Sequence, residues 1–426
     1  MKLHPARLVF VAVLIFLLYV FIASFVRKPP VTDASPVILA GWIDSQSFTA
    51  QYRYQNGWVR DGRHIMISAF EMPVYRYGQQ VMIRGVVEYV PERDFFRMQK
   101  TEISLADFPR SRAERVKVSL YQNIYSVRDW FLAGVSQALP EPYAAFINGI
   151  LVGARSQLPQ SIKDDFARTS TSHIIAVSGF NITIIANVIG WLALFVMRRN
   201  WAFWVCVGGL FLFMILTGAQ ASVVRATIMG ILLLLSQRVG RLPTPLHTLV
   251  LTAGAMVALD QRILRFDIGF QLSFLATAGI LLVSPLLDAR IPYVKHFGKL
   301  REIFIMTISA QLCVIPLLIY YFKSLSLVSL PANLIILPWI PWTMLAGFFA
   351  GIAGAFLPIL GQIIGTIAYL MSFFILQVIR FFAGISWAAV TVELSWPWIV
   401  VMYAILGGAC RWLAHRKPSY GLQSKI

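Results

Sequence analysis

The sequence predicts a polytopic α-helical membrane protein of about ten membrane segments, with a small extracytoplasmic domain made only of β-strands. Three observations lead to this fold class. Hydrophobic residues make up 58% of the 426 residues and charged residues 13%, unlike a soluble globular domain. Apolar stretches long enough to cross a bilayer recur in the second half, such as Ile174–Met197 and Trp201–Val224. Between residues 36 and 110, short alternating runs are instead separated by turn residues.

The net charge of +18 is explained first by membrane topology, and by itself it does not indicate a nucleic-acid partner. After His173 there are 17 Lys and Arg residues and five acidic residues. Most of these bases gather at 198–199, 238–241, 290–301 and 411–425, and loops poor in Lys and Arg separate these clusters. Such an excess marks loops that stay in the cytoplasm. We therefore expect a multi-pass protein of the cytoplasmic (inner) membrane, with both termini inside and the β domain outside.

Residues 1–27 predict the first membrane segment. The apolar run Leu8–Val26 is followed by Arg27-Lys28. A cleaved signal peptide is the alternative, but the run is long for such a peptide and basic residues replace the small residues of a cleavage site. We interpret this segment as an uncleaved anchor helix.

Residues 36–110 predict a five-stranded OB-like barrel. Alternating runs at 37–42, 48–54, 64–68 and 81–87 are separated by turn signals such as Asn56-Gly57 and Asp61-Gly62. OB folds hold single-stranded nucleic acid by stacking bases on aromatic side chains beside a basic groove. The alternative is that half of these aromatic residues form the barrel core. The candidate DNA contacts are Trp42, Tyr52, Arg53, Tyr54, Trp58, Arg60 and Arg63.

Residues 118–170 predict amphipathic, interfacial helices. Leu120, Ile124, Val127, Phe131 and Val135 recur at helical spacing, which is typical of a helix lying on a membrane or packed under the β domain. Residues 171–415 then predict the helical bundle, and 416–426 a cytoplasmic tail. The segments expected in the bundle are 174–197, 201–217, 222–237, 246–260, 268–287, 303–322, 329–352, 358–382 and 397–413.

Several of these segments are too short for a full crossing, which needs about 20 residues. Residues 245–259 give 15 residues, and 226–237 give 12 after Arg225. Pro331, Pro338 and Pro341 add a further interruption. Broken or re-entrant helices are tolerated where they line a cavity or are buried by protein, so this pattern favours a transport path over a simple anchor.

Arg225 is the most conspicuous polar residue, because it directly follows an uncharged apolar stretch. An arginine within the membrane normally faces a polar interior or a partner. Three interpretations remain open at this point: a charge that lines a path for an anionic substrate, a side chain that reaches the outer interface, or an ion pair with Asp267.

A second group surrounds Ser178-Gly179-Phe180-Asn181, which interrupts a helix capped by residues 169–172. Exposed amide and hydroxyl groups there would contact phosphates or bases. Alternatively, small and polar residues there would simply allow close helix packing. The same choice between interhelical hydrogen bonding and pore lining applies to Gln271, Ser273, Gln311 and Asn333. Gly347, Gly351, Ala355, Gly361 and Gly365 show the spacing of packing residues.

The sequence indicates no enzyme and no cofactor. The three cysteines and six histidines are dispersed, without a metal-binding or disulfide spacing, and no phosphate-binding loop occurs. Ser178 and His173 would be the nucleophile and base of a membrane hydrolase. They are five residues apart, on different faces of a helix, and no acidic partner is evident.

Five ordered motifs resemble the ComEC family, the membrane channels of bacterial DNA uptake. They are Asn148–Arg155, Phe166–Asn181, Gly218–Ala226, Asp267–Phe274, and Gln311–Pro316 followed by Pro331–Pro338. Residues 40–107 also resemble the OB-like domain of that family. Ala154 stands where the family would have an acidic residue. The C-terminal metallo-β-lactamase-like domain of many members has no counterpart before Ile426, so we expect the nuclease on another polypeptide.

The resemblance implies a channel that translocates single-stranded DNA across the bilayer during natural transformation. Its implied partners are a DNA receptor, a separate nuclease and a cytoplasmic helicase-type motor; it leaves the oligomeric state open. The alternative is a secondary transporter or exporter of another polar substrate. The candidate residues of the DNA path are His173, Ser178, Gly179, Asn181, Gln220, Ser222, Arg225, Asp267, Gln271, Ser273, Gln311 and Asn333.

Overall fold

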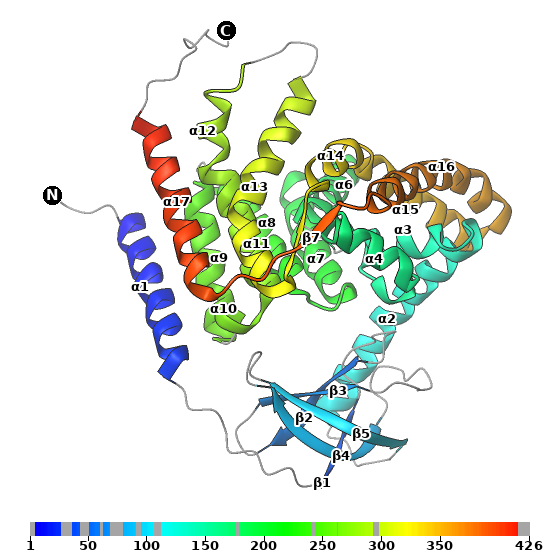
Figure 1. Ribbon diagram of the computed structural model, residues 1–426. Coiled ribbons are helices and arrows are strands. Elements are labelled where there is room, and N and C mark those ends of the chain that lie inside the picture. Colours follow the sequence, from blue (N-terminus) through cyan, green and yellow to red (C-terminus); the bar gives the residue numbers. More distant parts are fainter. Residues whose placement is uncertain are drawn as a thin grey trace.

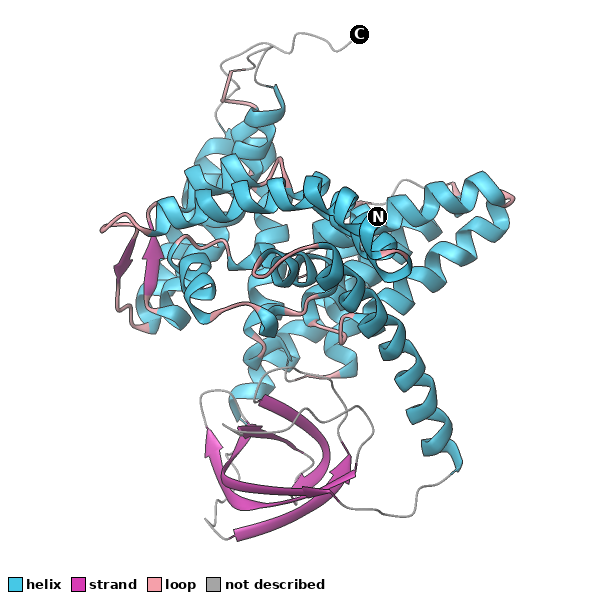
Figure 2. Cartoon of the chain, turned by 90° about the vertical axis from the view of Figure 1, so that its right-hand side faces the viewer, coloured by secondary structure: helices cyan, strands magenta, loops and turns pink. Residues whose placement is uncertain are grey.

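The computed structural model describes residues 5–26, 36–42, 51–59, 63–68, 80–90, 95–105, 112–175, 177, 179–240, 244–261, 263–292 and 298–415. The five strands between residues 36 and 105 lie together at one end of a helical bundle (Figure 1, Figure 2). The N-terminal helix α1 (Pro5–Val26) precedes this sheet in the chain, and α2 (Arg112–Ala138) leads from it into the bundle (Figure 1).

The sheet is built from β1 (Pro36–Trp42), β2 (Gln51–Val59), β3 (Arg63–Ser68), β4 (Gln80–Val90) and β5 (Phe95–Leu105). Its strand order is β1-β4-β5-β3-β2, and all neighbouring pairs are antiparallel except β3 with β5, which is parallel. The predicted turn at Asn56-Gly57 is wrong. These residues lie within β2, where the pairing with β3 is irregular: its register shifts between Tyr54 and Val59.

The predicted apolar stripe of helix α2 is partly buried and partly exposed. Val135 is buried, whereas Leu120 and Val127 are exposed. Arg128, which the spacing predicts on another face, is buried at 8% exposure. Beyond α2, the range predicted as interfacial holds α3 (Tyr143–Val152), the 3-10 turn η1 (Arg155–Gln157) and α4 (Gln160–Arg168). Because nearly all of α3 is buried, it forms part of the core of the bundle.

One lobe of the bundle joins two distant parts of the chain. Helices α2 to α4 and α5 (Ser172–Ile175) share a hydrophobic core with α14 (Ser329–Ile336), α15 (Ile340–Phe356) and α16 (Pro358–Ala383). Close contacts are made through glycines: a Cβ on Gly134 of α2 would lie 2.7 Å from Cβ of Ala355. A Cβ on Gly351 would lie 2.6 Å from Cγ2 of Val135. The predicted packing glycines thus sit where helices meet.

The other helices pack around smaller apolar clusters. The elements concerned are α6 (Gly179–Val196), α7 (Arg199–Leu216), α8 (Ala221–Val239), α9 (Pro245–Leu259), α10 (Ile263–Phe266), α11 (Ile268–Leu282), α12 (Ser284–Asp288), α13 (Gly298–Phe322) and α17 (Trp396–His415). Helices α6, α7 and α8 meet around Leu210 and Val223. Helices α1, α9 and α11 meet around Val20, Val257 and Phe270. A short ribbon of β6 (Ser324–Ser326) and β7 (Ala389–Thr391) connects the two lobes.

Each predicted membrane segment coincides with one or more helices. Six described helices are long and apolar enough to cross a membrane, or seven when α14 and α15, bent by 51° at their junction, count as one span. Helices α6 and α9 and the described part of α1 are apolar but shorter. Large apolar side chains face outward, such as Leu259 at 84% and Phe195 at 82% exposure. This surface is that of a polytopic helical membrane protein.

Two of the interruptions expected in the bundle differ in outcome. The bend near Pro338 separates α14 from α15, as the prolines predict. The expected shortening at Arg225 is wrong, because α8 runs without a break from Ala221 to Val239. A buried charge does not end this helix, since the guanidinium finds acceptors on a neighbouring helix.

Candidate functional site

The helix that contains the Ser-Gly-x-Asn motif is interrupted. Helix α5 ends at Ile175 and α6 begins at Gly179; Ser178 lies outside the described residues. Ahead of α5, the buried hydroxyls of Thr169 and Thr171 are 2.7 Å apart. Beyond the interruption, Asn181 Nδ2 donates to the carbonyl oxygen of Ile150 over 2.9 Å. The amide of Asn181 therefore fixes the start of α6 against the end of α3.

His173 lies on α5, and its side chain is exposed to solvent. Even so, the surrounding protein lowers the pKa of its imidazole below 6.5, although a hydrogen bond with the Ser170 backbone acts in the opposite direction.

The turn before α8 brings the Gly218–Ala226 motif next to the interruption between α5 and α6. Gly218 and Ala219 both adopt left-handed backbone, with φ of +75° and +49°. This turn presents Gln220, whose Oε1 accepts a hydrogen bond of 2.8 Å from Nη2 of Arg155. At the second residue of the helix, Ser222 Oγ donates to the carbonyl oxygen of Val177 over 2.9 Å. The start of α8 thus bridges η1 and the interruption between α5 and α6.

Arg225 points inward from α8, with 8% of its surface exposed. Its Nη1 donates to the carbonyl oxygen of Ser273 and to the hydroxyl of Thr277, both on α11. A Cβ on Gly179 would lie 3.2 Å from Nη2, so the glycine makes room for the guanidinium beside the helix interruption. This geometry differs from a side chain reaching the outer interface.

Asp267 does not form the ion pair considered for Arg225. It caps α11 by accepting a hydrogen bond of 2.8 Å from the backbone N–H of Phe270. The ion pairs among the described residues are Arg301 with Asp288 and Lys323 with Glu393. Within the described chain, the positive charge of Arg225 is therefore held by neutral acceptors only.

The remaining polar candidates link α11, α13 and α14. Tyr321 OH donates to Gln271 Oε1 over 2.9 Å, and Gln271 Nε2 donates to the carbonyl oxygen of Arg265 over 2.6 Å. Gln311 Nε2 donates to Ser329 Oγ over 2.5 Å. Asn333 Nδ2 donates to the carbonyl oxygen of Ser329 over 2.8 Å, while its buried Oδ1 has no partner among the described residues.

We call these residues together the polar band. It comprises His173, Gly179, Asn181, Gln220, Ser222, Arg225, Asp267, Gln271, Ser273, Gln311 and Asn333 from the prediction, with Arg155, Thr277, Tyr321 and Ser329 in addition. Hydrogen bonds directly join its members from η1 to α8, from α8 to α11, from α11 to α13 and from α13 to α14. Four of the five sequence motifs supply residues to these links, among them Asn148–Arg155 with Arg155. The remaining motif, Phe166–Asn181, is joined to α8 by the hydrogen bond from Ser222 to Val177.

The predicted DNA contacts of the β domain lie apart from the polar band in the sequence. Of the predicted contacts in the β domain, Trp42 lies on β1, Tyr52, Arg53, Tyr54 and Trp58 on β2, and Arg63 on β3, while Arg60 lies outside the described residues.

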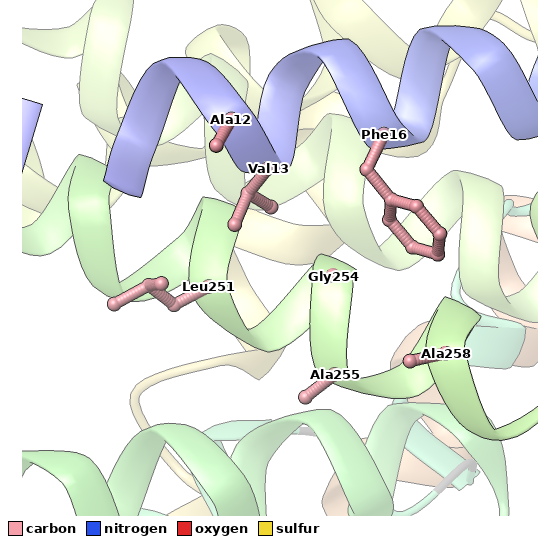
Figure 3. Close-up of a pocket in the computed structure, with 7 residues that line it drawn as sticks. All are labelled: Ala12, Val13, Phe16, Leu251, Gly254, Ala255 and Ala258. Carbon is pink, nitrogen blue, oxygen red and sulfur yellow. The ribbon is translucent and has the colours of Figure 1, made fainter. Parts of the chain in front are cut away.

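A groove of about 470 Å³ between α1 and α9 is lined by Val13, Phe16, Leu251 and their neighbours (Figure 3). Its lining is apolar, so it offers no recognition of a charged substrate. Among the described residues, no group of His, Cys, Asp and Glu side chains forms a metal site.

The fold and the polar band define a polytopic helical membrane protein with polar contacts between its helices. A family model described as "Competence protein" matches residues 150–417, well over half of the sequence, and the chain therefore belongs to the Competence protein family. This confirms the resemblance to the ComEC family seen in the motifs.

The chain is also similar to ComE operon protein 3 of Bacillus subtilis (strain 168), with 26% identity over 231 residues. The match covers 54% of this chain and 29% of that relative, so the chain corresponds to less than a third of the relative's length. No solved structure matches the chain.

Proposed function

We propose that the chain forms the membrane channel through which single-stranded DNA enters the cytoplasm during natural transformation. The observation that carries this proposal is Arg225, a buried cation with neutral partners beside an interrupted helix. An unneutralised guanidinium lowers the free energy of a phosphate that leaves bulk water. Membership of the Competence protein family supports the same assignment.

The β domain supports the proposal in a secondary way. Its strand order, with parallel pairing of β3 and β5, agrees with the OB type of Greek-key barrel. OB folds present aromatic and basic residues to single strands. We propose that this domain faces the extracytoplasmic side and guides the strand toward the bundle. The proposed partners in this pathway are a DNA receptor, a nuclease and a helicase-type motor.

The test is transformation of a strain that lacks its own channel but retains the other uptake components. The strain is complemented with wild type, with Arg225→Gln, or with Arg238→Gln as a matched control. Arg238 lies on the same helix but is exposed, with its guanidinium carbon 4.7 Å from the ring centroid of Phe203. Immunoblots of membranes check that all three chains insert equally.

We expect wild type and Arg238→Gln to restore transformation, and Arg225→Gln to lower it by at least about tenfold, the effect of one lost charged hydrogen bond. Equal rescue by Arg225→Gln would remove Arg225 from the mechanism. Failure of the wild type, with the chain's own receptor, nuclease and motor supplied, would contradict the DNA channel. Uptake assays with other polar solutes would then test the secondary transporter, because interrupted helices also bind substrates in such proteins.

A further inference from the structure

Arg155 has features of a ligand-binding group that the sequence patterns do not single out. It is exposed on η1, and its single side-chain partner within the described chain is the neutral Oε1 of Gln220. A guanidinium carries several N–H donors in a planar fork, so most of the Arg155 donors remain available. Desolvation by the surrounding protein nevertheless lowers the pKa of the Arg155 guanidinium.

The position of Arg155 is fixed by the elements around it. Asn148 Nδ2 donates to Gln157 Oε1 over 3.1 Å and anchors η1 to the buried helix α3. Gly153, with φ of +79°, allows the chain to pass close to Gln220: a Cβ there would lie 3.1 Å from Nε2 of that side chain. Gln220 itself follows the two left-handed residues before α8. Such support holds the guanidinium in one orientation before a ligand arrives.

The two arginines of the polar band are connected through α8. Arg155 is bound to Gln220 at the start of this helix, and Arg225 follows five residues later in the sequence. Five residues of α-helix rise about 7.5 Å and turn about 140° around the axis, so Gln220 and Arg225 lie at different heights and on different faces of this helix. Neither arginine has a carboxylate partner within the described chain.

We infer that Arg155, oriented by Gln220, binds a phosphodiester of the translocated single strand and so adds a phosphate site to that of Arg225. This inference rests on the proposed function and adds a specific contact to it. Planar, charge-assisted hydrogen bonds to phosphate oxygens are the interaction that an arginine fork makes best.

The test measures binding of a fluorescent oligo-dT of about 16 nucleotides to the full chain purified in detergent, over a series of salt concentrations. We expect Arg155→Gln to bind roughly tenfold more weakly than wild type. It should also reduce the slope of log K against log salt by about 0.7, the value for one phosphate contact in a single strand. Arg168→Gln is the matched control, since Arg168 is exposed on α4 and donates to the carbonyl oxygen of Ile385 over 3.4 Å.

Further variants separate charge from positioning. Arg155→Lys keeps the charge, so the salt slope should stay while the affinity falls. Gln220→Ala should likewise lower the affinity and keep the slope, because it removes only the support of the guanidinium. An uncharged peptide nucleic acid of the same sequence should bind wild type and Arg155→Gln equally.

Each outcome answers a different question. Wild-type affinity and slope in Arg155→Gln would overturn the Arg155 site and leave the DNA channel in place. Absence of oligo-dT binding by the wild type would count against the proposed function itself. Arg155→Lys serves as the test variant if Arg155→Gln does not elute as a single folded species. A wild-type affinity in Arg155→Lys would contradict binding of the phosphate by the planar guanidinium of Arg155.

Discussion

Arg225 shows how a membrane protein keeps a bare charge inside its fold. A carboxylate would pair with the guanidinium and cancel its field, but here a carbonyl and a hydroxyl accept hydrogen bonds from Nη1 and leave the charge intact, and the buried Nε has no partner within the described chain. The charge remains expensive to bury. The surrounding contacts with Ser273, Thr277 and the space beside Gly179 must offset that cost.

The stability of the protein should depend on pH through His173. The imidazole has a pKa below 6.5 in the folded chain and about 6.5 when unfolded. Below pH 6.5 the unfolded state therefore binds more protons, and stability falls as the pH decreases. We expect the melting temperature of wild type to drop more than that of His173→Gln between about pH 7.5 and about pH 5.5. Equal drops in the melting temperatures of both proteins would contradict the lowered pKa of His173.

Sequence patterns found some residues of the polar band and missed others for a physical reason. Arg225 is conspicuous because a charge beside an apolar stretch is rare. Arg155 is equally charged, but its partner Gln220 is 65 residues away, and no local pattern shows that contact. Thr277 and Tyr321 are ordinary residues of apolar helices until a neighbouring helix supplies a partner.

At the scale of elements, the contact of α2 with α15 depends on the absence of side chains. A Cβ on Gly134 would lie 2.7 Å from Cβ and 2.8 Å from the backbone nitrogen of Ala355, and closer still to the carbonyl oxygen of Gly351. Backbone atoms of a packed helix cannot rotate away, so the helices themselves would have to move apart. The fit therefore tolerates glycine alone at this position.

We expect Gly134→Ala to destabilise the protein by about 1–3 kcal/mol through overpacking. Gly408→Ala on α17 is the control, because a Cβ there meets nothing within 4 Å. Its higher helix propensity should leave stability unchanged or raise it by up to about 1 kcal/mol. Thermal unfolding in detergent distinguishes the two variants, and equal melting temperatures would show that the α2–α15 contact yields without cost.

Helix positions were largely predictable, whereas helix partners were not. Apolar runs and prolines identify the bundle segments and the bend between α14 and α15. The division of α2 into buried and exposed parts depends on where α15 and α16 pack, more than 190 residues later in the chain. The irregular stretch of β2 at Asn56-Gly57 resembles a turn in the local sequence, because glycine suits both structures.

At the scale of the whole molecule, the distribution of basic residues predicts an orientation that cysteine labelling can test. A background without Cys206, Cys313 and Cys410 would carry either Asp61→Cys in the β domain or Lys417→Cys in the tail. We expect a membrane-impermeant maleimide to label Asp61→Cys in intact spheroplasts. Lys417→Cys should react only after permeabilisation, because Lys- and Arg-rich ends stay in the cytoplasm.

The reverse labelling pattern would invert the topology and place the β domain in the cytoplasm. Transformation by each single-cysteine chain serves as the control for a native fold. The same charges cannot predict how the lobes assemble, since topology fixes which side a loop occupies and leaves helix neighbours undetermined.

The neutral surroundings of Arg225 have a consequence for the energy supply of the cell. Any opening in a cytoplasmic membrane threatens the proton gradient across it. A fixed positive charge within a narrow passage repels protons and metal cations while it attracts polyanions. If single strands pass beside Arg225, this residue has two effects. It attracts their phosphates, and it reduces the leak of protons through the passage when no strand is present.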